Sequence, residues 1–230
     1  TTGETTKAGV SSPVLLPDVA ILDASLTLGL PQHITAMTGI DAMVHAIEAY
    51  TSKIKKNPIS DMLALRALTL LAGNMRTVLT TPDDVSAREA VLLGSMFAGQ
   101  AFANAPVGAV HALAYPLGGH YHIPHGLSNS LMLPAVLSFN AEVCPELYTE
   151  LACVLPGAAR SAQGLIDWLK ALIDDSGLPA TLAQADIPEK DHAMLAKDAM
   201  LQQRLLINTP REVDEATALR LYRDAWSGWS

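Results

Sequence analysis

Residues 35–50 read TAMTGIDAMVHAIEAY, and this stretch indicates the fold class. Its apolar side chains recur every three or four positions, from Ala36 through Ile40 and Val44 to Ile47. That spacing puts them on one face of a helix, so the stretch is predicted to be helical. From residue 32 onward the predicted fold class is mainly α, a helical bundle. Further helices are expected over residues 58–79, 86–103, 128–139, 145–155, 161–176 and 214–226.

The N-terminal part has a different texture. Residues 10–31 are predicted to be extended, and the short apolar runs within residues 14–23 are typical of a buried strand. Residues 2–5 are turn-like, so a small hairpin is expected there. Residues 1–31 are therefore expected to come from a β-containing layer that leads into a helical part over residues 32–230.

Composition excludes several classes of protein. The 230 residues include 15 Lys and Arg against 23 Asp and Glu, which gives a formal net charge of −8, and 50% are hydrophobic. A disordered chain would be poorer in apolar residues, and a partner of nucleic acid or of an anionic membrane would need clustered cations. Two cysteines, Cys144 and Cys153, are too few for a disulfide scaffold and suit a reducing cytoplasm. No signal peptide is visible.

One long segment carries no charge. Residues 90–141 contain no Asp, Glu, Lys or Arg, where average usage would put roughly 13 charged residues. Polar residues, prolines and glycines interrupt the segment, so it offers no run of about 20 apolar residues that could span a membrane. We interpret it as a segment that is buried in protein or lines a cavity.

Four side chains form a candidate metal set. Asp41 and His45 are four residues apart on one predicted helix and project from the same face. His111 and His125 both lie in the uncharged segment. A carboxylate with three imidazoles suits Zn²⁺ or Fe²⁺ and is too rich in nitrogen for Mg²⁺ or Ca²⁺. Spacing alone leaves a second interpretation open, in which these are structural core residues held by hydrogen bonds.

Long, ordered motifs run through the chain. Besides residues 35–50, residues 108–119 read GAVHALAYPLGG and residues 123–126 read IPHG. Shorter motifs are LPDVAILD at 16–23, NPISD at 57–61 and NTPR at 208–211. Together they resemble the iron-containing (group III) alcohol dehydrogenase family over essentially the whole chain.

The resemblance implies roles for individual residues. Asp41, His45, His111 and His125 match the metal ligands of the family, whose metal is Fe²⁺ in many members and Zn²⁺ in others. The family transfers hydride between NAD(P)(H) and an alcohol or carbonyl compound. Its fold has an α/β dinucleotide-binding domain followed by an all-helical metal domain, similar to dehydroquinate synthase. By that resemblance residues 1–31 are a remnant of the first domain, and residues 32–230 are the metal-binding catalytic domain.

Two departures from the family pattern concern the cofactor and the proton route. Many members carry a second His four residues after the third ligand, where this chain has Tyr115. A phenol can relay a proton but is a poorer base near neutral pH. The family's glycine-rich nucleotide loops would precede Thr1, and Lys7 resembles a family lysine near the cofactor.

Other readings of the same residues remain open. A metal-dependent lyase of the dehydroquinate synthase type shares the architecture, but it needs basic residues for an anionic substrate. A non-catalytic metal-binding helical domain is a further alternative. The expected partners are a small alcohol or aldehyde and other copies of the chain in a homo-oligomer, with no nucleic acid and no membrane. Among the other histidines, His120 and His122 are expected either to line the substrate cleft or to be simple surface residues, and His33 and His192 to face solvent.

Overall fold

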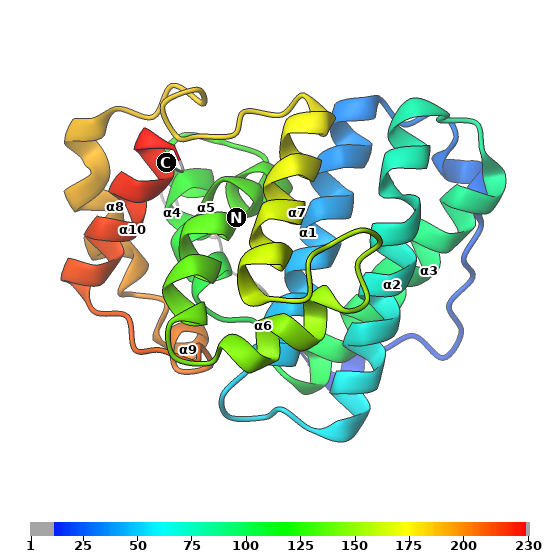
Figure 1. The fold of residues 1–230 in the computed structure, drawn as a ribbon, viewed down its shortest axis with the longest axis horizontal. Coiled ribbons are helices and arrows are strands. Elements are labelled where there is room, and N and C mark those ends of the chain that lie inside the picture. Colours follow the sequence, from blue (N-terminus) through cyan, green and yellow to red (C-terminus); the bar gives the residue numbers. More distant parts are fainter. Residues whose placement is uncertain (1–11, 229–230) are drawn as a thin grey trace.

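The structure, a computed structural model, describes residues 12–228. Within this range it contains helices and turns and no strand, so the mainly α fold class is confirmed. The longer helices form a bundle, shown in Figure 1. The helices are α1 (Gln32–Thr51), α2 (Pro58–Thr80), α3 (Val85–Asn104), α4 (Ala109–His120), α5 (His125–Ala141), α6 (Pro145–Ala152), α7 (Ala162–Ser176), α8 (His192–Ala199), α9 (Gln203–Leu206) and α10 (Glu215–Ser227), with short 3-10 turns η1 (Pro13–Leu15), η2 (Ala24–Thr27) and η3 (Glu189–Asp191).

Helix α1 lies at the centre of the bundle. It packs against α2, α3 and α5 (Figure 1), and most of its side chains are buried, except on the face that carries Thr38, Asp41 and His45. Ile40, Met43 and Ile47 have no exposed surface. Apolar side chains cover most of the surface of α1, so enclosing the helix between other helices removes a large apolar area from water. The central position of α1 therefore follows from the composition of residues 35–50.

Capping side chains start several of the helices. Asn57 accepts hydrogen bonds from the first turn of α2 and forms a capping box with Ser60, and Pro58 occupies the first helical position. The side chains of Asp84, Ser161 and Asp214 accept in the same way at the starts of α3, α7 and α10. These oxygens satisfy backbone N–H groups that have no partner inside the helix.

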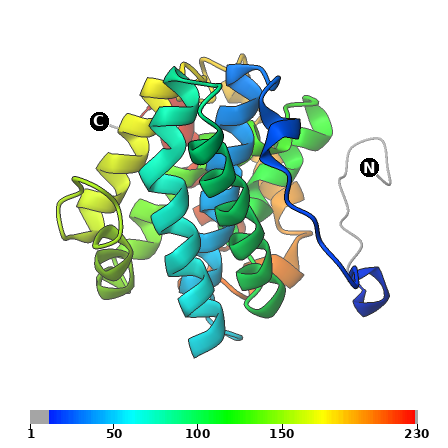
Figure 2. The ribbon, with the colours of Figure 1, turned by 90° about the vertical axis from the view of Figure 1, so that its right-hand side faces the viewer.

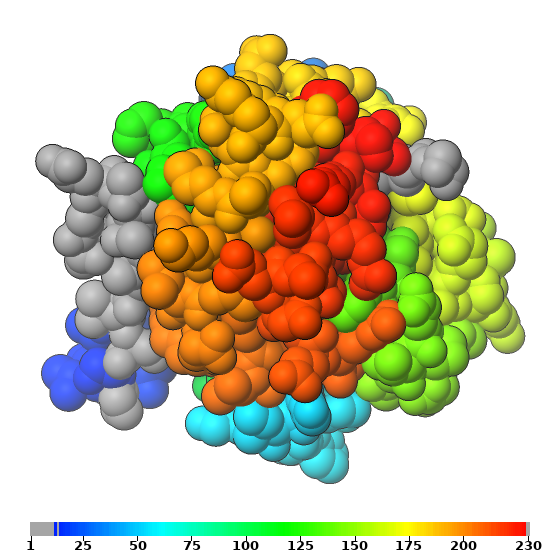
Figure 3. All heavy atoms as spheres, turned by 90° about the vertical axis from the view of Figure 1, so that its left-hand side faces the viewer, coloured from blue at the N-terminus to red at the C-terminus, as the bar shows by residue number. Residues whose placement is uncertain are grey.

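The C-terminal helices of the chain pack against α4 and α5. Helices α4 and α5 pack against each other, and α10 packs against both α5 and α8. Figure 3 shows that the segments from α8 to α10 form one continuous side of the molecule. Tyr222 of α10 is fully buried and donates a hydrogen bond to the Leu113 carbonyl of α4 at 2.6 Å, which joins this side to the core.

The predicted strand over residues 14–23 is wrong for the part of the chain that the structure describes. The segment has no strand partner, and Figure 2 shows it running along the outside of the bundle into α1. Val14 is 90% exposed and Ile21 is 88% exposed. An extended chain becomes a strand only when a neighbour accepts its backbone hydrogen bonds, and no such neighbour lies among the described residues. The hairpin predicted over residues 2–5 lies outside the described residues.

The structure differs from the sequence-based predictions at α4 and at His192. Residues 109–120 form a regular helix even though Pro116 lies inside it. Local proline and glycine content argued against a helix there, but every residue of α4 except Tyr115 and His120 is buried, so packing outweighs propensity. His192 is 1% exposed rather than solvent-facing, and its ring contacts those of Tyr222 and Trp226.

Helix α2, and helices α3 and α4 taken together, are long and apolar enough to be considered as membrane spans. Among residues 12–228, only α2 is long and apolar enough by itself to cross a membrane, and 44% of its qualifying window is buried inside the protein. Helices α3 and α4 would qualify together, but they are bent by 106° at their junction. Core helices of soluble proteins meet the same criterion, so these two features are weak support for a membrane span.

Candidate metal centre

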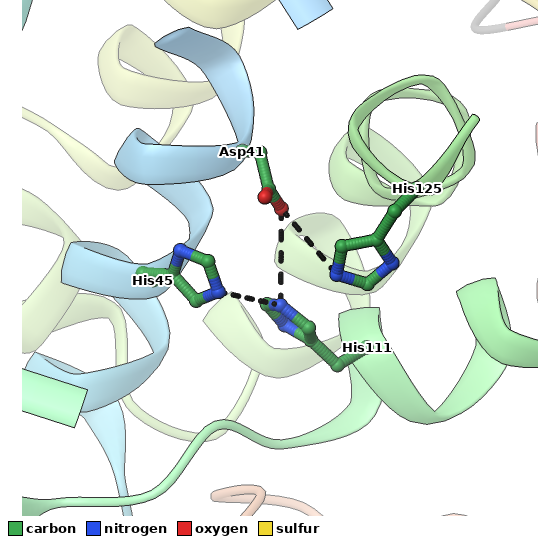
Figure 4. Close-up of side chains that lie close together, drawn as sticks. All are labelled: Asp41, His45, His111 and His125. Carbon is green, nitrogen blue, oxygen red and sulfur yellow. Dashed lines mark hydrogen bonds and ion pairs between the residues drawn. The ribbon is translucent and has the colours of Figure 1, made fainter. Parts of the chain in front are cut away.

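Three helices bring four side chains to one point. Asp41 and His45 come from α1, His111 from the first turn of α4, and His125 is the first residue of α5, as Figure 4 shows. One potential ligand atom from each residue lies within 4.8 Å of the other three. His45 Nε2 is 3.0 Å from His111 Nε2, and Asp41 Oδ1 is 3.8 Å from Nε2 of both His111 and His125.

Close packing of two helices sets the position of His125. The next residue, Gly126, faces the Met37 backbone of α1, and a Cβ atom there would clash with the Met37 carbonyl group. Only glycine lets the start of α5 approach α1 this closely. The glycine of the IPHG motif therefore positions the neighbouring histidine beside Asp41.

Burial decreases across the cluster. The side chain of His111 is 2% exposed, that of Asp41 is 18% exposed and that of His125 is 36% exposed. The innermost side of the cluster is thus enclosed by protein, and the side formed by His125 is open to solvent. As far as residues 12–228 show, the open side is therefore the side from which a small molecule could approach the cluster.

The environment of His45 keeps its ring neutral. Its ring stacks on Phe102 at a centroid distance of 4.5 Å and on His111 at 4.7 Å. Burial, helped by the neighbouring His111 and opposed by Asp41, lowers the pKa of His45 to about 4. Near neutral pH the imidazole is therefore unprotonated, and a nitrogen lone pair is available to a cation.

Glu48 contacts the Nδ1 atom of His111, on the opposite side of the ring from the Nε2 atom that faces the cluster. Its Oε2 atom lies 2.6 Å from His111 Nδ1, and its Oε1 atom accepts a hydrogen bond from the Val110 backbone N–H at 2.7 Å. If His111 donates its Nδ1 proton to this buried carboxylate, its Nε2 lone pair faces the cluster, as a metal ligand requires. The sequence motifs by themselves do not assign a role to Glu48. Its position three residues after His45 on the same helical face was the available indication.

Replacing Glu48 tests this support. The variant Glu48→Gln keeps the shape but loses the charge and one accepting oxygen, so we expect metal affinity to fall by about 10- to 100-fold. Chelator competition followed by elemental analysis measures the change. The matched control is Glu212→Gln at an exposed site, which should bind metal like the wild type. Equal affinities of the two variants would contradict the role given to Glu48.

Asn129 is a second residue that the sequence did not single out. It is fully buried on α5, one turn after His125, and its amide donates to Asp41 Oδ1 at 2.5 Å. The same Nδ2 atom lies 3.2 Å from His111 Nε2 and 3.3 Å from His125 Nε2. Asn129 thus contacts three members of the cluster and holds the Asp41 carboxylate in place.

The other predicted site residues divide into three groups. The Tyr115 ring lies 5.8 Å from the His125 ring between centroids, so Tyr115 borders the cluster. His120 instead pairs with Asp198 at 2.6 Å, and His122 is exposed in the turn between α4 and α5, with a positive φ of 56°. Lys7 lies outside the described residues.

The donor chemistry fits a first-row transition metal. Three imidazoles and one carboxylate are ligand types found with Fe²⁺ and Zn²⁺. In such sites a second carboxylate typically accepts a hydrogen bond from the ring nitrogen of a histidine ligand that does not bind the metal. The four side chains of the cluster, with Glu48 and Asn129 behind them, could hold a metal of this kind.

Residues 35–226 match the family described as "Fe-containing alcohol dehydrogenase family, C-terminal". The chain belongs to this family. The family match begins with the segment that carries Asp41 and His45 and includes α4 and α5, so it contains all four members of the cluster. The similarity to this family noted from the sequence motifs is thereby confirmed.

Relatives within the iron-containing alcohol dehydrogenase family are considerably longer. Long-chain-alcohol dehydrogenase 1 of Geobacillus thermodenitrificans is 40% identical over 98% of this chain and 58% of its own length. A crystal structure of 1,3-propanediol oxidoreductase matches with a TM-score of 0.86 and 36% identity, over 92% of this chain and 56% of the other. The structure of sulfoacetaldehyde reductase from Bifidobacterium kashiwanohense in complex with NAD⁺ matches with a TM-score of 0.84 and 28% identity, over 93% of this chain and 56% of the other. The chain thus spans little more than half the length of these relatives.

Proposed function

We propose that the chain is the metal-binding part of a metal-dependent, NAD(P)-linked alcohol dehydrogenase or carbonyl reductase. The observation that carries the proposal is the convergence of four ligand atoms within 4.8 Å, with the most exposed of the four residues on the open side. Family membership supports the same reaction class. The substrate proposed is a small alcohol or aldehyde.

Asp41, His45, His111 and His125 would hold Fe²⁺ or Zn²⁺. When bound, such a metal supplies Lewis-acid polarisation of a substrate oxygen. Glu48 and Asn129 hold His111 and Asp41 in place, which reduces the reorganisation needed on binding. Tyr115, next to the open side, is positioned to hold or pass a proton at its hydroxyl oxygen.

The cofactor and the domain division are part of the same proposal. NAD or NADP would bind mainly through a dinucleotide-binding domain, to which residues 1–31 would belong and to which Lys7 would contribute. The exposed apolar side chains of residues 14–22 support this division, because an apolar segment of this kind is normally covered by other protein. A reducing compartment such as the cytoplasm, and assembly into a homo-oligomer, are further expectations. Both cysteines are free, which suits such a compartment.

Metal analysis and a hydride-transfer assay test the proposal in two steps. Anomalous scattering from crystals of the chain is expected to place one metal ion among the four residues. The protein that joins this chain to a nucleotide-binding domain of the family is then expected to oxidise reduced nicotinamide in the presence of small aldehydes. A chain without metal at this position would refute the proposal. Bound metal without hydride transfer would instead favour the lyase or the non-catalytic domain.

A further inference from the structure

The NTPR motif connects the three helices that carry the candidate ligands. The Asn208 side chain donates a hydrogen bond to the Val107 carbonyl, just before α4, at 3.0 Å. The Asn208 carbonyl accepts one from the Lys53 backbone N–H, just after α1, at 2.7 Å. The Thr209 hydroxyl donates to Asn140 Oδ1, near the end of α5, at 3.3 Å. The motif therefore ties together the ends of α1, α4 and α5.

A small internal cavity is bounded by this motif and by Glu48. Its volume is about 10 Å³, which is the room that one water molecule needs. The polar side chains that line the cavity come from α1, α5, α6 and the NTPR motif, and they are Glu48, Thr51, Asn140, Tyr148, Asn208 and Thr209. Polar cavities of this size hold ordered water in proteins, whereas cavities that stay dry are apolar.

The Tyr148 hydroxyl needs a partner in this cavity. Tyr148 lies on α6 and has no exposed surface, and its hydroxyl forms no hydrogen bond with any residue in the range 12–228. Asn140 and Thr51 lie near the hydroxyl, but in neither case does the geometry complete a hydrogen bond. Burial raises the pKa of Tyr148, so the phenol stays protonated and has a proton to donate. A buried hydroxyl group without a partner is costly and rare in proteins.

The Glu48 carboxylate can supply the matching acceptor. Its Oε1 atom accepts from the Val110 backbone N–H, and its Oε2 atom lies 2.6 Å from His111 Nδ1. A carboxylate oxygen has two lone pairs, so each of these atoms can accept one more hydrogen bond. In the described part of the chain Tyr148 and Glu48 form no direct hydrogen bond, so a molecule that both accepts and donates is needed to join them. Water does both.

We propose that this cavity binds one water molecule, which accepts a hydrogen bond from the Tyr148 hydroxyl and donates one to the Glu48 carboxylate. Tyr148 is thereby a positioning residue for His111, acting through the water and Glu48. The water bridge follows from the cavity itself, whereas the positioning role rests on the proposed function, because it requires His111 to hold a metal. The NTPR motif also gains a role, since Asn208 and Thr209 form part of the wall that encloses the water.

Two measurements that need no metal test the water bridge. Removal of a hydroxyl that has no partner would leave the Tm unchanged or raise it, because an unpartnered buried hydroxyl destabilises the fold. For metal-free Tyr148→Phe we instead expect the Tm to fall by about 2–4 °C, the shift that loss of one hydrogen bond causes in a chain of this size. A crystal structure of the wild type should show an ordered water within hydrogen-bond distance of Tyr148 Oη and of a Glu48 oxygen. An unchanged or higher Tm, or a cavity without such a water, would overturn the bridge.

Metal binding tests the positioning role. Chelator competition should show that Tyr148→Phe binds Zn²⁺ more weakly, by up to about 10-fold, the lower end of the range for groups that touch a ligand directly. The visible absorption bands of bound Co²⁺ report the geometry of the ligands, and they should shift in the same variant. The matched control is Tyr121→Phe, whose hydroxyl donates to Asp191 at 2.7 Å and does not line the cavity. It should match the wild type in Zn²⁺ affinity and in the Co²⁺ bands.

The outcomes distinguish this inference from the proposed function. Folded Tyr148→Phe with the Zn²⁺ affinity and the Co²⁺ bands of the wild type would overturn the positioning role and leave the proposed function standing. Wild-type chain that takes up no metal would overturn the proposed function, and the positioning role would fall with it. The crystal structure and the Tm of Tyr148→Phe would still decide the water bridge in that case, and the crystal structure decides it even if the variant does not fold.

Discussion

His125→Ala is expected to lower metal affinity by more than about 100-fold, beyond the usual range for loss of a residue that only supports a ligand. The substitution removes one of three imidazoles, on the side of the cluster that is already open to solvent. Asp41, His45 and His111 would remain in place, because they come from α1 and α4. Elemental analysis after dialysis against a weak chelator measures the effect.

The control for His125→Ala is another histidine. His33 is exposed in the first turn of α1, so His33→Ala should retain the metal content of the wild type. Thermal unfolding of the metal-free variants should show that both fold. Full metal occupancy in folded His125→Ala would mean that His125 is not a ligand.

Gly126→Ala is expected to damage both the fold and the metal centre. An alanine Cβ would lie 2.7 Å from the Met37 carbonyl carbon and closer still to its oxygen, and backbone atoms cannot rotate out of the way as a side chain can. Overpacking of this kind costs about 1–3 kcal/mol of unfolding free energy. Relief requires α5 to move away from α1, which would carry His125 away from Asp41. Denaturant unfolding and metal analysis of the same sample should both show a loss.

Gly99→Ala provides the matched comparison. Gly99 lies within α3, and a Cβ added there meets nothing within 4 Å. Alanine is the better helix former, so this variant should be more stable by about 0.4–1 kcal/mol and should keep its metal. If Gly126→Ala were as stable as Gly99→Ala, the contact between α5 and α1 would not be what restricts position 126 to glycine.

The longer helices could be predicted because their causes are local. Apolar spacing marks α1 and α2, and Asn57-Pro58 marks the start of α2. Helix α4 could not be predicted in this way, since its glycines and Pro116 argue against a helix until the surrounding packing is known. The strand over residues 14–23 was wrong for the converse reason. Its pattern is that of a strand, but the hydrogen-bonding partner a strand needs is absent among the described residues.

The residues of the site likewise divide into those that local sequence spacing can predict and those that depend on contacts between helices. Asp41 and His45 could be paired from the sequence, because four residues are about one helical turn. The contributions of Glu48 and Asn129 could not, because each depends on contacts between helices: Glu48 of α1 with His111 of α4, and Asn129 of α5 with Asp41 of α1. His192 was misplaced because nothing in its immediate sequence indicates that two aromatic rings of α10 cover it.

The helical class, the family resemblance and the four residue types suited to a metal all follow from the amino-acid sequence alone. That these four side chains meet, and which side of the cluster is open, depends on the tertiary structure. The physical reason is the distance along the chain over which each effect acts. Helical periodicity relates residues a few positions apart, whereas helix packing decides which distant faces touch, and that packing depends on side chains along the whole chain.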